Sequence, residues 1–261
     1  MSDAKLVNTE AYDHLADWYL SWVSAQISPR ERYAAKVLEK YNSKNNGNGN
    51  GKDNDNDLGE IKDQITSVPS SSSPPSSSPP PPPPQPQPQQ PPYILELGCG
   101  PGHPITTLLL SAGARVIAND ISPAQIAKAK LHSHSHAHSS RVTFIASDMT
   151  LLSLPPSTLD GAICFFTLFH LPRAEQPPML SKIFSWLKIG ALLVCNFATF
   201  DEEEIYGEMM GMGIFWSGFD VGQNRAMLVD AGFEIEEEEV LESEADGGNE
   251  FQWVAARKTR A

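Results

Sequence analysis

The sequence predicts a doubly wound α/β fold, in which a mostly parallel sheet of seven strands carries helices on both faces. The first reason is that short apolar segments alternate with helical patterns from residue 93 onward. The second is a glycine-rich loop, GCGPG at 98–102, between the first apolar segment and a helix. The third is a turn at 246–248 that separates two final apolar segments and predicts an antiparallel hairpin at one edge of the sheet.

The individual elements of this domain, 93–261, follow from the same patterns. Strands are expected at 93–97, 115–119, 141–146, 160–166, 191–197, 233–241 and 251–257. Helices are expected from the glycine loop to about 111, from the S-P-A-Q capping box at 122–125 to about 131, over 179–187 with Gly190 as C-cap, and over 224–231. The continuous apolar run at 160–166 is typical of a strand buried on both faces.

A helical cap is expected over residues 1–41. Apolar residues recur at helical spacing from Tyr12 to Ile27, which predicts one amphipathic helix. A second helix begins at Ser28, where proline follows and Glu31 completes a capping box. Because two helices cannot form a core alone, we expect them to pack on the domain at 93–261.

Residues 42–92 differ sharply in composition, since Asn, Gly, Ser, Pro and Gln dominate and a proline run occupies 79–84. Few of these side chains can enter a core, so the entropy cost of ordering should prevail and this low-complexity linker should be disordered. Its proline tract favours polyproline II, which leaves open a second interpretation as the ligand of a proline-binding protein.

Composition excludes several function classes. The net charge of −13 argues against a nucleic-acid partner, which requires a basic face. Cys99, Cys164 and Cys195 form no CxxC pair, which predicts reduced core thiols in a cytoplasmic protein. Because neither an apolar signal core nor an apolar run of ~18 residues is found, we expect no membrane association.

The alternate histidines of 132–138 would share one face of a strand and could chelate a metal ion. The tract lies among serines between a helix and a strand, where surface insertions accumulate. We therefore expect flexible histidines and no metal site.

Chemistry-bearing residues follow three strands of the expected parallel sheet. Ligands of such sheets bind beyond the carboxyl ends of the strands, where the strand order reverses. The glycines of 98–102 permit positive φ and let a ligand lie against the main chain. Asp120 ends the second strand and can accept from ribose hydroxyls, whereas Asp148 and Met149 follow the third and suit a purine with an amino group. This set predicts a nucleoside-containing cofactor.

The glycine spacing suggests which nucleoside it is. Dinucleotide-binding loops show G-x-G-x-x-G with the pyrophosphate at the helix N-terminus. Here the spacing is G-x-G-x-G, and Glu96 lies two residues before the first glycine. Negative charge at this place suits a cationic cofactor that carries an ammonium and a sulfonium.

ILELGCGPG at 94–102, NDIS at 119–122, ASDM at 146–149 and the terminal hairpin together resemble the class I S-adenosylmethionine-dependent methyltransferases, whose sheet is Rossmann-like. FHLPRAEQ at 169–176, KIFSWLKIGALLVCNF at 182–197 and FWSGFD at 215–220 are similar to the small-molecule branch of that family. The resemblance implies an enzyme that transfers a methyl group from S-adenosylmethionine to an oxygen or nitrogen of a small molecule, with specialised metabolism as one setting. The cofactor-binding residues that it implies are Glu96, Gly98, Gly100, Gly102, Asp120, Ile121, Asp148 and Met149.

The substrate side is expected near the fourth strand. His170 follows that strand and is the candidate general base, with a structural role as the alternative. Tyr12, Trp18 and Tyr19 from the first helix, and Trp216 from the methionine-rich segment 201–219, are the candidate substrate residues. Core packing remains the alternative for these aromatic residues, and a plain connection for 201–219.

Two rival functions remain at this point. The first is methylation of a protein or an RNA, although CFFT at 164–167 stands where an Asn-Pro-Pro-Tyr-type motif would follow the fourth strand. The second is a catalytically silent cofactor-binding module that is recruited through its proline tract.

Overall fold

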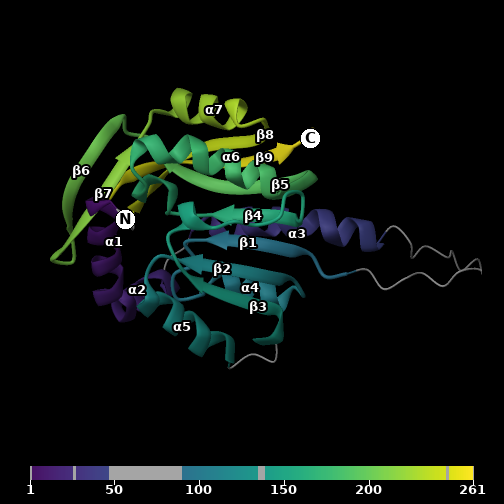
Figure 1. The fold of residues 1–261 in the computed structure, drawn as a ribbon, viewed down its shortest axis with the longest axis horizontal. Helices are drawn as coiled ribbons and strands as arrows, with labels where there is room; N and C mark the ends of the chain where they lie inside the picture. The colour runs from purple at the N-terminus through teal and green to yellow at the C-terminus, as the bar shows by residue number, and fades with distance from the viewer. Residues whose placement is uncertain (1, 26–27, 47–89, 135–138, 245–246, 261) are drawn as a thin grey trace, which may run out of the picture.

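The computed structural model describes residues 2–25, 28–46, 90–134, 139–244 and 247–260. Its main sheet has seven strands in the order β3-β2-β1-β4-β5-β9-β8 (Figure 1). The strands are β1 (Tyr93–Leu97), β2 (Arg115–Asp120), β3 (Val142–Ala146), β4 (Leu159–Cys164), β5 (Leu187–Ala198), β8 (Phe233–Ser243) and β9 (Asn249–Lys258). The first five are parallel, and β9 is antiparallel to both β5 and β8. The predicted doubly wound fold with a C-terminal antiparallel hairpin is confirmed.

Helices cover both faces of this sheet. The helices α6 (Gln176–Trp186) and α7 (Val221–Asp230) pack on one face, and α3 (Arg30–Asn46), α4 (Ile105–Ser111) and α5 (Pro123–His134) pack on the other (Figure 1). Leu95 belongs to the core under α6, whereas the adjacent Ile94 belongs to the core under α3. Because successive strand residues point to opposite faces, both faces of β1 are buried, as its apolar sequence requires.

The strand order reverses beside β1, which has β2 on one side and β4 on the other. The loops that follow β1 and β4 therefore leave the sheet at the same edge and diverge there. This crevice brings the glycine loop at 98–102 next to the segment 165–170, where η3 (Leu168–His170) lies.

The predicted first helix is wrong in its bounds. Two helices occupy this stretch, α1 (Asp3–His14) and α2 (Ala16–Ser24), separated at Leu15 with φ −89° and ψ 3°. Apolar periodicity missed α1 because its buried face includes two polar residues, Lys5 and Asn8. The helix α3 continues to Asn46, into the expected linker at 42–92, while residues 47–89 lie outside the described residues.

A second sheet was not predicted. It pairs β6 (Glu202–Met209) with β7 (Met212–Gly218) in antiparallel fashion, inside the segment expected to be a covering connection. Glutamates at both ends of β6 conceal the strand pattern, because only one face of the pair meets the protein. The pair lies beside α1 (Figure 1), and Phe215 of β7 is fully buried.

Other predicted boundaries also need correction. Gly190 does not close α6, because that helix ends at Trp186 and β5 already begins at Leu187. Gly190 lies instead within β5 with φ +80°, where the pairing between β4 and β5 shifts register. The strand β4 ends at Cys164, so Phe165 and Phe166 belong to the following loop.

The remaining sequence expectations concern cysteines and membranes. Cys99, Cys164 and Cys195 are buried and form no disulfide, as predicted. Among the described helices, none combines the length and the apolar character that crossing a bilayer requires.

Asn8 holds α1 against β7 through a buried amide. Phe215 N–H donates to Asn8 Oδ1 at 2.7 Å, and Asn8 Nδ2 donates to the carbonyl oxygens of Phe215 at 3.1 Å and His170 at 3.3 Å. The side chain therefore completes backbone hydrogen bonding where β7 has no further strand neighbour in the described sheet.

Replacing Asn8 with alanine should lower the free energy of unfolding by about 2–4 kcal/mol, because buried backbone groups of Phe215 lose their partners. Urea unfolding measures this change. Glu10→Ala, on the exposed side of the same helix, is the control and should stay within about 0.5 kcal/mol. Equal unfolding midpoints for native protein and Asn8→Ala would contradict the assignment.

Candidate functional site

The glycine loop after β1 adopts left-handed backbone at Gly98, Gly100 and Gly102, with φ of +68°, +53° and +77°. A Cβ at Gly98 would lie 2.2 Å from Thr167 Oγ1, in the loop after β4. A Cβ at Gly102 would lie 3.1 Å from that of Ala129 in α5. These two glycines are thus required by packing within the protein, whereas Gly100 is the one that lines a cavity.

Asp120 fastens this loop to the end of β2. Its Oδ2 accepts from Gly100 N–H at 2.8 Å, and its Oδ1 accepts from Ser122 N–H at 2.9 Å. Burial raises the pKa of Asp120 to about 6, although these backbone hydrogen bonds oppose the shift. Because a carboxylate offers about four acceptor positions, each oxygen can still accept from a ligand hydroxyl.

Glu96 lies behind the loop and does not line the described cavities. It is 5% exposed, and it accepts from Thr106 Oγ1 at 2.6 Å. Burial raises the pKa of Glu96 to about 8, Thr106 opposes this shift, and the charge of Asp120 adds to it. The negative charge that the sequence suggested at this place is therefore mostly absent near neutral pH in the protein without ligand.

Glu96→Gln should stabilise the protein at pH 9 and change little at pH 5. The folded pKa of about 8 lies above the ordinary 4.5, so the folded protein keeps a proton that the unfolded chain releases. The stability from this carboxyl is fully present below about pH 4.5 and is lost as the pH rises through 8, at about 1.4 kcal/mol per pH unit.

Thermal unfolding at the two pH values measures the effect of Glu96→Gln, since glutamine keeps an acceptor for Thr106 without the charge. Glu203→Gln, at an exposed position of β6, is the matched control. Equal melting temperatures of native protein and Glu96→Gln at pH 9 would show that this carboxyl is not a buried, reluctantly ionised group.

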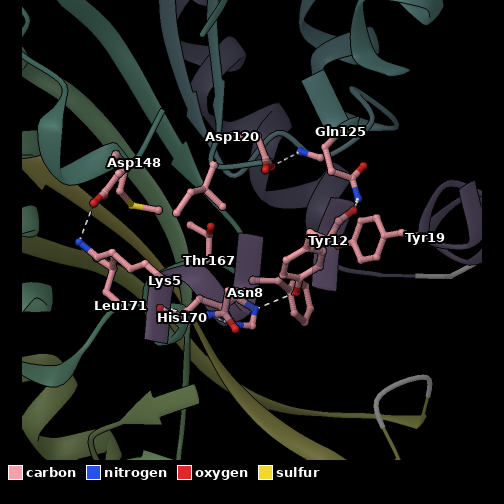
Figure 2. Close-up of a pocket in the computed structure, with 14 residues that line it drawn as sticks. Lys5, Asn8, Tyr12, Tyr19, Asp120, Gln125, Asp148, Thr167, His170 and Leu171 are labelled. Carbon is pink, nitrogen blue, oxygen red and sulfur yellow. Dashed lines mark hydrogen bonds and ion pairs between the residues drawn. The ribbon is translucent and has the colours of Figure 1, made fainter. Parts of the chain in front are cut away.

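Asp148 is bound by a lysine that sequence analysis did not find. Lys5 Nζ of α1 donates to Asp148 Oδ2 at 2.7 Å (Figure 2). The same ammonium donates to Thr150 Oγ1 at 3.1 Å and pairs with Glu175. Burial alone would raise the pKa of Asp148, but the hydrogen bonds from Lys5 and Thr150 hold it below its ordinary value. Asp148 is therefore ionised, and Lys5 occupies one of its oxygens.

His170 and Tyr12 form a buried hydrogen-bonded pair. His170 Nδ1 lies 3.0 Å from the carbonyl oxygen of Phe215, to which it donates, so Nε2 accepts from the Tyr12 hydroxyl at 2.9 Å. Burial lowers the pKa of His170 to about 4, although the bond to Phe215 opposes the shift. The imidazole is therefore neutral at physiological pH, with its basic nitrogen directed at Tyr12.

A small cavity of about 60 Å³ lies where these groups meet (Figure 2). The sequence-predicted residues that line it are Tyr12, Tyr19, Gly100, Asp120, Ile121, Asp148, Met149 and His170. The lining residues that sequence analysis missed are Lys5, Asn8, Gln125, Phe166, Thr167 and Leu171. Glu96, Gly98 and Gly102 do not line it, since they lie behind the loop or against neighbouring elements.

Gln125 shows that this cavity has an unused polar group. The residue is 1% exposed, and its Oε1 has no hydrogen-bond partner among the described residues. Because a buried acceptor without a partner is costly, this oxygen is suited to receive a hydrogen bond from a bound ligand.

A second cavity of about 720 Å³ adjoins the first. Tyr12, Tyr19, Phe166 and His170 line both cavities and so form a common wall. Trp18 and Trp216, two of the candidate substrate residues, line only the larger one. Phe166 has φ +53°, a strained conformation that places its ring in this wall.

The histidine tract does not contribute to either cavity in the described part of the chain. His132 Nδ1 lies 3.0 Å from the carbonyl oxygen of Pro101. His136 and His138 fall outside the described residues. Among residues that the structure describes, no group of three potential ligands is arranged to hold a metal ion.

Residues 94–190 match the sequence model of a protein family described as "Methyltransferase domain". Within these residues the chain is similar to a methyltransferase domain. The matched residues include most of β1 and the glycine loop, together with Asp120, Asp148 and His170, which line the small cavity.

Curated relatives match only part of the chain. The sterol 24-C-methyltransferase of Pneumocystis carinii is 27% identical over 158 residues, which cover 57% of this chain and 41% of that protein. The carboxy-S-adenosyl-L-methionine synthase of Vibrio parahaemolyticus is 26% identical over 120 residues, which cover 45% of this chain and 48% of that protein. The chain thus spans less than half the length of these relatives.

Solved structures of methyltransferases share the fold of this chain. The 1,6-didemethyltoxoflavin-N1-methyltransferase of Burkholderia thailandensis superposes with a TM-score of 0.53 at 21% identity, covering 66% of this chain and 72% of that chain. A SAM-dependent methyltransferase of Methanosarcina mazei gives a TM-score of 0.56 at 24% identity, covering 66% and 95%. The resemblance to class I methyltransferases is therefore confirmed at the level of the fold.

Proposed function

We propose that this chain is an S-adenosylmethionine-dependent methyltransferase that methylates an oxygen or nitrogen of a small molecule. One observation carries the proposal: a cavity lined by Gly100, Asp120 and Asp148 shares a wall with a larger aromatic cavity. Methyl transfer needs donor and acceptor in adjoining sites that exclude water, and this arrangement supplies both.

The residues around the small cavity fit an adenosyl cofactor. The backbone of 98–102 would hold its methionine part, Asp120 would accept from the ribose hydroxyls, and Asp148 with Ile121 and Met149 would meet the adenine. The orphaned Gln125 Oε1 offers one further acceptor. Glu96, which lies behind the loop, would be favoured in its ionised form by a cationic cofactor in the small cavity.

The closed cavity requires a movement before cofactor binding. Its volume of about 60 Å³ is far below the ~300–1,000 Å³ typical of ligand sites. Lys5, Asn8 and Tyr12 all reach it from α1, so displacement of this helix opens the site. Asp148 is ready to bind an amino group once Lys5 leaves it, since the same oxygen is involved.

When bound, S-adenosylmethionine supplies a methyl group already activated by its sulfonium. The chain has to orient the acceptor, exclude water and take up a proton where the acceptor loses one. His170 Nε2 can take that proton through the Tyr12 hydroxyl, because it is the unprotonated nitrogen and both side chains line the two cavities.

We infer the kind of acceptor atom from the Tyr12–His170 pair. The relatives are named for carbon methylation of sterols and for nitrogen methylation of a toxoflavin precursor, so their names leave the atom open. A proton relay in the shared wall favours an oxygen or nitrogen that is deprotonated as it is methylated.

The proposal is tested by calorimetry with S-adenosylhomocysteine and by mass spectrometry. The protein is incubated with isotopically labelled methyl donor and an extract of the cells that make it, and labelled small molecules are sought. Donor-product binding without any labelled small molecule, but with labelled protein or RNA, would replace this proposal with the rival acceptor class. Absence of binding would refute the cofactor assignment.

Tyr12→Phe should lower kcat by about 10²-fold while donor affinity changes little, because the variant keeps the ring and removes only the relay hydroxyl. Steady-state kinetics with the identified acceptor measures it. Tyr206→Phe, on the exposed face of β6, is the control. Unchanged kcat in Tyr12→Phe would exclude the relay and leave His170 with a structural role.

A further inference from the structure

The larger cavity is lined by a buried, positively charged side chain. Arg30, the first residue of α3, is 6% exposed and lines the cavity of about 720 Å³. Its guanidinium lies 4.4 Å from the ring centre of Phe166 and 6.0 Å from that of Trp22. Arg30 is thus stacked against aromatic residues of the larger cavity, where we place the acceptor. Phe166 belongs to the wall shared with the small cavity, where we place the methyl donor.

This guanidinium has no anionic partner within the described part of the chain. The ion pairs and side-chain hydrogen bonds found there do not include it, and its backbone N–H is the group that bonds to Ser28. The neighbouring Arg32, by comparison, pairs with Glu239. Because Arg30 is 6% exposed and stacks on aromatic rings, few water molecules can serve these donors, and an anion in the cavity could accept from them.

The charges around the cavity indicate what would complete it. Glu208 and Glu250 also line it, but both are exposed at its rim, and no second lysine or arginine lines it among the described residues. A single guanidinium matches one negative charge. A carboxylate fits its paired donors, whereas a doubly charged phosphate would remain partly uncompensated next to two glutamates.

The rest of the cavity is aromatic. Trp18, Trp22, Phe169, Trp216 and Phe251 line it together with the residues of the shared wall. Flat rings pack well against such faces, and the volume of about 720 Å³ falls within the range of ordinary ligand sites. The geometry therefore combines an aromatic compartment with one anchored positive charge.

We propose that the acceptor is an aromatic carboxylic acid whose carboxylate pairs with Arg30 while its ring occupies the aromatic cavity. That the bound acid is the methyl acceptor rests on the proposed function. Anion binding by Arg30, however, can be measured without methyl transfer. Arg30 thereby determines the substrate class, and the Tyr12–His170 pair lines the same cavity.

The test compares naphthalene-2-carboxylate with the neutral naphthalene-2-carboxamide on the full chain. Trp18, Trp22 and Trp216 line the cavity, so quenching of tryptophan fluorescence reports binding directly. The carboxylate should bind at least about tenfold more tightly than the amide, since only the carboxylate forms charge-assisted hydrogen bonds with the guanidinium.

Arg30→Met keeps an apolar stem of similar length and should remove this preference, with the amide bound as before. Arg30→Lys should retain part of it, and Arg32→Met at the exposed neighbouring position should retain all of it. Calorimetry with S-adenosylhomocysteine on the same samples reports the donor site separately, so loss of donor binding refutes the proposed function without affecting the Arg30 result.

Three results would overturn the inference. The first is equal binding of both probes by the native protein, which is expected of a cavity for neutral apolar acceptors. Arg30→Met could weaken both probes to the same extent, which would make Arg30 a packing residue. The third is the absence of binding of either probe at millimolar concentration, which would exclude aromatic acids of this size as ligands.

Discussion

Gly98→Ala should lower the free energy of unfolding by about 2–5 kcal/mol and abolish donor binding. Left-handed backbone costs an L-residue about 1–2 kcal/mol, and forcing an atom into packed surroundings costs about 1–3 kcal/mol more. The new Cβ would lie 2.2 Å from Thr167 Oγ1 and 2.7 Å from Thr167 Cβ. Because Thr167 follows β4, the loops after β1 and β4 must separate. The small cavity between them, which we assign to the methyl donor, then loses its shape.

Gly247→Ala is the matched control for backbone strain. This glycine has φ +74°, but a Cβ there meets nothing within 4 Å. In this variant the free energy of unfolding should fall only by the cost of left-handed backbone for an L-residue, and the affinity for S-adenosylhomocysteine should stay unchanged. The double variant Gly98→Ala/Thr167→Gly should recover part of the stability. Urea unfolding that does not distinguish Gly98→Ala from Gly247→Ala would disprove the close contact between the two loops.

Asp120→Asn should weaken S-adenosylhomocysteine binding by at least about a hundredfold at pH 8, where the native carboxyl is ionised. Asp120 now receives Gly100 N–H on one oxygen and Ser122 N–H on the other. An asparagine offers one oxygen only, so its NH₂ group must face one of these N–H donors. The loop is displaced, and charge-assisted hydrogen bonds to ribose hydroxyls, each worth about 1.5–3 kcal/mol, are lost.

Calorimetry measures this affinity, with Asp230→Asn at the exposed end of α7 as the control. Circular dichroism of Asp120→Asn should match the native protein, which separates loss of binding from loss of the fold. An affinity within threefold of native would remove Asp120 from the cofactor site and with it the main support for the proposed cofactor.

The parallel sheet was predictable because both of its faces are buried. Such strands are apolar throughout, so β1 and β2 could be located from the sequence nearly to the residue. The chemistry at the ends of β1, β2 and β3 was predictable for a related reason. Parallel strands present their carboxyl ends at one edge, so Gly100, Asp120 and Asp148 had to converge.

The N-terminal part of the site was much less predictable. Lys5 and Asn8 are buried on α1, yet polar residues on a helix normally indicate its exposed face. Their burial depends on partners far along the chain, Asp148 for Lys5 and Phe215 for Asn8. The pair β6 and β7 escaped detection as well, because one exposed face gives a mixed pattern that glutamates obscure.

Local periodicity and strand polarity suffice to place the sheet, the glycine loop and the carboxylates beyond the strands. The protonation and pairing of these groups, by contrast, depend on contacts made in the folded protein. Burial makes Glu96 mostly neutral near pH 7, Lys5 occupies Asp148, and Arg30 lies among aromatic rings without a carboxylate partner in the described chain. Charge states and pairings depend on the distance to distant residues and on solvent access, and neither quantity is encoded in local spacing.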